Sequence, residues 1–183
     1  MLTELLPDAR IFDSETVGSM LRPVLASVPV ADFQDHPPWR ALVVETAAQI
    51  LGYVGGTLVV PQSVLVRAYW TELRDGFAKS GIPLRHFVLH ADPLTLAARI
   101  DNDPEGTGIR RWRHDHVAPY AAALPWLREE AEIVETADVA PDEVARRIAA
   151  AVTAQGVSVK SPLAGGAWHA RPPRRRNTRI APL

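Results

Sequence analysis

The chain has 183 residues, 47% of them hydrophobic, and a formal net charge of −1. This length and hydrophobic fraction suffice for one domain of ordinary size with a packed core. The balanced charge excludes a general attraction to nucleic acid or anionic lipid, and the absence of cysteine excludes a disulfide scaffold, a thiol nucleophile and a thiolate metal site. We find no signal peptide and no apolar run of the roughly 20 residues that a membrane helix needs, which predicts a cytoplasmic protein.

Short apolar runs alternate with longer amphipathic segments, a pattern typical of a parallel sheet covered by helices. In chain order it predicts the end of a helix at 1–6, a strand at 9–13, and helices at 17–25 and 35–51. A buried strand at 57–60, a helix at 66–80, a strand at 84–90 and a helix at 93–100 follow. After a polar break at 102–108 we expect a helix at 109–130 with bends at Pro119 and Pro125, a strand at 132–136 and an amphipathic helix at 141–155.

The regular pattern stops at about residue 156, so we expect one domain at 1–156 and a disordered Arg/Pro-rich tail at 157–183. The arginines between Arg171 and Arg179 are candidates for contacts with nucleic acid or an acidic partner. No nucleic-acid fold motif accompanies them, and a solvated extension is the favoured interpretation.

Five segments, in this order and spacing, carry a resemblance to a known family: 12–18 (FDSETVG), 32–40 (DFQDHPPWR), 59–62 (VVPQ), 86–91 (HFVLHA) and 110–113 (RRWR). Together they resemble the P-loop kinases that phosphorylate small molecules, and among these the tunicamycin-resistance ATP-binding proteins. The resemblance covers nearly all of 1–155.

This resemblance implies an α/β fold, a P-loop NTPase-like three-layer sandwich with a parallel sheet. Its first strand, central in the sheet, should lead into a phosphate-binding loop with the pattern Gly-x-x-x-x-Gly-Lys-Ser/Thr. That pattern occurs nowhere in the chain, so we expect the central strand and the phosphate loop to be missing. Two explanations stay open: a start codon placed too late, or a truncated relic.

Two carboxylates follow the first predicted strand. Asp13 and Glu15 are two residues apart in an extended segment, which places both on one face at the edge where open α/β sheets bind ligands. Asp13 is the candidate for orienting the acceptor hydroxyl during phosphoryl transfer, and Glu15 for contacting the substrate. The alternative is that Asp13 caps the following helix and Glu15 is solvated.

Three arginines follow the polar break and resemble the lid of small kinases. Arg110 and Arg113 share a helix face and are candidates for clamping phosphate oxygens, while Arg111 points elsewhere and is a candidate for contacting the nucleotide. The alternative is a solvated basic helix face.

The resemblance implies substrate-facing residues in 32–40 and after the strand at 57–60. The candidates are Gln34, Trp39, Arg40 and Gln62. Trp39 could instead belong to the core. Pro61 and Gln62 stand where a Walker-B strand would end in Asp, which leaves a direct Mg²⁺ ligand in doubt.

We predict no metal site: His114 and His116 are two residues apart in a helix and point in different directions. The intact family would bind ATP and Mg²⁺ and act on a nucleoside-like small molecule. As it stands, this chain is expected to bind neither cofactor and to lack kinase activity. The alternatives are a non-catalytic protein that binds and sequesters its ligand, and an unstable fragment.

Overall fold

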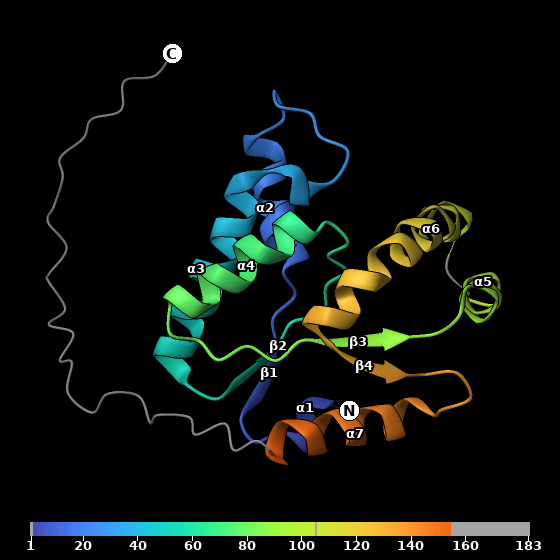
Figure 1. The fold of residues 1–183 in the computed structure, drawn as a ribbon. Coiled ribbons are helices and arrows are strands. Elements are labelled where there is room, and N and C mark those ends of the chain that lie inside the picture. The colour runs from blue at the N-terminus through green and yellow to red at the C-terminus, as the bar shows by residue number, and fades with distance from the viewer. Residues whose placement is uncertain (1, 105, 155–183) are drawn as a thin grey trace, which may run out of the picture.

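The computed structural model describes residues 2–104 and 106–154, and the tail predicted at 157–183 lies outside them. Within these residues four short strands alternate with helices (Figure 1). In chain order the elements are α1 (Leu2–Leu5), β1 (Ala9–Ile11), α2 (Glu15–Val24), the 3-10 helix η1 (Phe33–Asp35), α3 (Pro37–Val54), β2 (Thr57–Val59), α4 (Arg67–Lys79), β3 (Phe87–His90), α5 (Pro93–Asp101), α6 (Thr107–Glu130), β4 (Glu132–Glu135) and α7 (Pro141–Ala154).

All strand pairing is parallel. β1 pairs with β2, with Ile11 opposite Val59, and β3 pairs with β4, with His90 opposite Glu135. The two pairs form separate two-stranded sheets, and no ladder joins β2 to β3 in the described part of the chain. Parallel strands need helical crossovers between them, which the chain supplies as α2–α3 and α5–α6.

Local sequence explains where several helices begin and end. Pro93 follows the N-cap Asp92, whose carboxylate accepts hydrogen bonds from the first free amides of α5. α4 ends just before Gly81, which adopts a φ of 69° that favours glycine. α6 continues through Pro119 and Pro125 as one helix.

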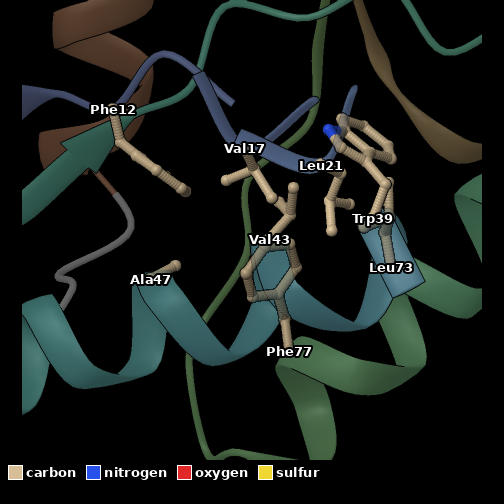
Figure 2. Packing of buried hydrophobic residues seen from close by; sticks show 8 residues of the cluster. All are labelled: Phe12, Val17, Leu21, Trp39, Val43, Ala47, Leu73 and Phe77. Atoms are coloured by element: carbon tan, nitrogen blue, oxygen red, sulfur yellow. The ribbon is translucent and has the colours of Figure 1, made fainter. Parts of the chain in front are cut away.

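The larger hydrophobic cluster joins β1 to three helices (Figure 2). Phe12 follows β1, Val17 and Leu21 come from α2, Trp39, Val43 and Ala47 from α3, and Leu73 and Phe77 from α4. Trp39 is fully buried, with 0% of its surface exposed. This cluster fixes the carboxyl end of β1, because Phe12 and Val17 bracket the turn between β1 and α2.

The second sheet lies between two helical layers. Val88 packs with Ala123 and Leu127 of α6 on one face, and Val134 packs with residues of α7 on the other face. Figure 1 shows α6 above β3 and β4, with α1 and α7 below them. Side chains alternate between these faces along each strand, as the pleat requires.

The predicted α/β fold and the type and order of its elements are confirmed by the structure. The strands form two parallel pairs, and no ladder joins β2 to β3 among residues 2–104 and 106–154. Among the described residues no helix is both long enough and apolar enough to span a membrane.

Candidate functional site

A buried serine links the carboxyl ends of β1 and β2. Ser14 is 0% exposed, and its hydroxyl donates to Oε1 of Gln62 at 2.6 Å. The indole N–H of Trp39 donates to the Ser14 carbonyl at 3.0 Å. The Ser14 hydroxyl therefore links the turn after β1 to the loop after β2, and the Trp39 indole links the same turn to α3.

Asp13 lies at this edge and is exposed. Its Oδ1 accepts a hydrogen bond from the backbone N–H of Glu15 at 2.9 Å, so one carboxylate oxygen caps the start of α2. The N-cap position itself belongs to Ser14, whose side chain makes no cap bond because it is turned toward Gln62. The predicted cap thus comes from Asp13. Its Oδ2 has no hydrogen-bond partner in the described residues, and Glu15 is exposed beside it.

Arg40 is built into the framework behind this edge. Its side chain is 7% exposed and bonds the carboxylate of Glu72 at 2.6 Å. It also donates to the Gln34 carbonyl and lies 4.2 Å above the ring centre of Tyr69. The hydroxyl of Tyr69 donates in turn to Asp35, and this hydrogen bond, followed by burial, raises the pKa of Tyr69.

These contacts show how two of the predicted substrate contacts, Trp39 and Arg40, are placed. Trp39 has no exposed face to offer a ligand, since its ring is enclosed by the core. Arg40 is committed to Glu72, so its guanidinium is not free to bind a substrate. Both residues position the site instead: Trp39 holds Ser14, and Arg40 holds the backbone of Gln34.

Gln34 and Gln62 are half-buried at the same edge. The side-chain amide of Gln34 donates to the Ser63 carbonyl at 3.0 Å, next to Gln62 in the chain. The structure therefore brings Gln34, Gln62 and Ser14 together at the carboxyl end of β2, and Asp13 follows β1 beside them. Sequence reasoning missed Ser14, because its partner Gln62 lies 48 residues further along the chain.

The predicted lid arginines lie in the first two turns of α6. Arg113 pairs with Asp103 at 2.6 Å, and Arg110 donates to the Asp101 carbonyl at 3.4 Å, while Arg111 is exposed. No ion pair or hydrogen bond among the described residues joins these arginines to Asp13. α6 contacts α4 through Glu130, about 30 Å along the helix from Arg110.

The two histidines after the arginines have separate partners. Nε2 of His114 contacts Asp101 at 2.8 Å, and Nδ1 of His116 contacts the Trp112 carbonyl at 2.7 Å. No group of three or more side chains that could hold a metal ion occurs in the described residues.

A groove of about 770 Å³ lies on the α7 side of the second sheet. Apolar side chains from α1, β3, α5 and α7 line it, with Arg99 and Thr136 among its polar members. Leu89 of β3 faces it and is 56% exposed. A volume in this range suits a small molecule or a turn of helix.

The fold is a mixed α/β architecture with short parallel strands and polar residues at their carboxyl ends, the usual place for a ligand in such proteins. The solved structure of the Deinococcus radiodurans tunicamycin resistance protein is similar, with a TM-score of 0.66 and 29% sequence identity over 82% of this chain and 86% of that one. No protein-family model matches the chain, and neither does any curated protein sequence. The structural similarity supports a relationship between this chain and that protein.

Proposed function

We propose that this chain is a member of the small-molecule phosphotransferase family that includes tunicamycin-resistance proteins, and that it binds a nucleoside-like ligand. The observation that carries the proposal is the similarity to the D. radiodurans protein, at 29% identity over most of both chains. The name of that protein connects it with tunicamycin resistance, and we extend a ligand of this type to the present chain.

The ligand contacts would come from the edge formed by β1 and β2. Asp13 offers a free carboxylate oxygen, and the amide nitrogen of Gln62 has no hydrogen-bond partner among the described residues. Ser14 fixes Gln62 from below, which holds the amide in one orientation before the ligand arrives. A free carboxylate oxygen after β1 and a fixed amide after β2 suit the hydroxyl and amide groups of a nucleoside.

The residues of this chain do not fit an ATP·Mg²⁺ site. A triphosphate needs the backbone amides and lysine of a glycine-rich loop, and no Gly-x-x-x-x-Gly-Lys-Ser/Thr pattern occurs in the 183 residues. Arg113 is already paired with Asp103. We therefore propose that this polypeptide by itself does not transfer phosphate.

The break between the two sheets supports this interpretation. β2 and β3 each leave one edge unpaired in the described residues, and a further parallel strand between them would complete both ladders. Leu89, on β3 at the break, is 56% exposed. We propose that a strand and phosphate loop absent from these 183 residues would occupy this space.

A second candidate function is resistance by sequestration. The hydrogen bonds of Asp13 and Gln62 form without a phosphate loop, so the contacts proposed for the ligand do not depend on bound nucleotide. Such a protein would lower the free concentration of its ligand without changing it chemically.

Thermal melts with uridine and tunicamycin, together with an assay for ADP release from ATP, test these proposals. A ligand at one hundred times its Kd should stabilise the protein by about 2.7 kcal/mol, with no nucleotide present and no ADP released. Stabilisation by neither nucleoside compound would contradict ligand binding. Ligand-dependent ADP release would contradict the absence of transfer.

A further inference from the structure

A histidine at the end of β3 is anchored on one side only. Nδ1 of His90 contacts the hydroxyl of Tyr120 at 2.7 Å. Nε2 has no hydrogen-bond partner among the described residues and is not buried. When Tyr120 donates to Nδ1, the neutral ring carries its proton on Nε2.

The backbone beneath this ring is fixed by a chain of hydrogen bonds. The carbonyl of His90 accepts from both the backbone N–H and the hydroxyl of Thr136, each at 2.8 Å. Arg99 donates to the hydroxyl oxygen of Thr136 at 2.9 Å and also to its carbonyl. α5, β4 and α6 therefore all constrain His90, and its ring is held in place before any ligand binds.

Glu135 lies beside the ring on the same face of the sheet. It is the register partner of His90, and directly opposite residues of paired strands project from one face. The pKa of Tyr120 is raised by burial and then by the charge of Glu135, which agrees with a carboxylate facing the same helix. Glu135 is exposed, and its side chain has no hydrogen-bond partner among the described residues.

With Tyr120 donating to Nδ1, the pair presents a donor at Nε2 next to an acceptor at the carboxyl end of the second sheet. A phosphate would meet the negative charge of Glu135, whereas neighbouring hydroxyl or amide groups can both accept from Nε2 and donate to the carboxylate. The positive charge of Arg128 lowers the pKa of Tyr120 and so opposes the effect of Glu135 on that pKa.

We propose that His90 and Glu135 form a subsite for an uncharged, hydroxylated part of the ligand, such as the sugar of a nucleoside, with Tyr120 as the positioning residue. This inference rests on the proposed function and names the chemistry of one contact. It predicts discrimination against phosphate at this position.

Nuclear magnetic resonance of the full chain with labelled histidine tests the proposal, with uridine and inorganic pyrophosphate as probes. The His90→Ala variant identifies the His90 ring signals. We expect these signals to shift saturably with uridine, following the Kd measured by calorimetry, and to stay in place with pyrophosphate. This readout uses the unaltered protein, so it does not depend on whether a variant folds.

Affinity measurements on variants give the second readout. His90→Ala and Glu135→Gln should each weaken uridine binding about tenfold, the loss expected for roughly 1.4 kcal/mol of hydrogen bonding. His116→Ala, on α6 but with its own partner, should change it less than twofold. Tyr120→Phe should weaken binding and mix the two ring tautomers of His90, an effect that a purely structural role would not produce.

Uridine binding that leaves the His90 signals unmoved would overturn the subsite while the proposed function stands. Movement with pyrophosphate and not with uridine would also overturn it. No uridine binding at all would remove the proposed function and this subsite together.

Discussion

The Ser14–Gln62 hydrogen bond yields a quantitative test of how the site is held. Its 2.6 Å length and the complete burial of Ser14 make it a well-formed bond. Ser14→Ala should cost about 0.5–1.5 kcal/mol of unfolding free energy. The loss stays moderate because half-buried Gln62 can turn its freed oxygen toward water. For a chain of this size, 1 kcal/mol lowers the Tm by about 2–4 °C.

A double-mutant cycle with Ser14→Ala and Gln62→Met isolates this bond. Urea unfolding followed by circular dichroism should give a coupling energy of about 1 kcal/mol between the two substitutions. Ser19→Ala, an exposed serine on α2, is the matched control and should change stability by less than about 0.5 kcal/mol. The same Ser14→Ala variant should weaken uridine binding, because Gln62 loses its fixed orientation. A coupling energy near zero would refute the reasoning.

Three further outcomes are expected from urea unfolding. Trp39→Ala should cost about 3–5 kcal/mol of unfolding free energy, since the ring is fully buried. Trp112 is 52% exposed, so Trp112→Ala should cost less than about 1 kcal/mol. Equal losses of unfolding free energy would contradict the assignment of Trp39 to the core. Gly76→Ala should destabilise the protein by about 1 kcal/mol or more, because the added Cβ would lie 2.9 Å from a valine methyl of α3. Gly52→Ala has open space around its Cβ and should stabilise the protein. Higher stability in both variants would contradict this packing. Burial lowers the pKa of His86, so neutral His86 contributes fully to the unfolding free energy above about pH 6.5, and this contribution is lost as the pH falls. His86→Phe should flatten the dependence of the unfolding free energy on pH. An unchanged pH profile would contradict this assignment.

Helices and strands could be predicted from the sequence because local signals determine them. Asp92 and Pro93 mark the start of α5. Gly81 marks the end of α4, because the backbone there adopts a positive φ that glycine tolerates better than other residues. The register of β1 with β2 and of β3 with β4 depends on which distant segments meet, and no local pattern records that.

The roles of individual polar residues were harder to predict for the same reason. Arg40 was a candidate ligand contact by its position, yet Glu72, 32 residues further along the chain, neutralises it. The participation of Ser14 depends on Gln62, 48 residues away. His90 becomes a candidate only once β3 and β4 are paired, which places Glu135 beside it.

The most direct test of the central claim is a calorimetric titration of the 183-residue protein with uridine and, separately, with ATP·Mg²⁺. A nucleoside-binding edge without a phosphate loop predicts saturable uridine binding and ATP binding no tighter than about micromolar. Sub-micromolar ATP affinity, or the absence of any uridine binding, would contradict the account.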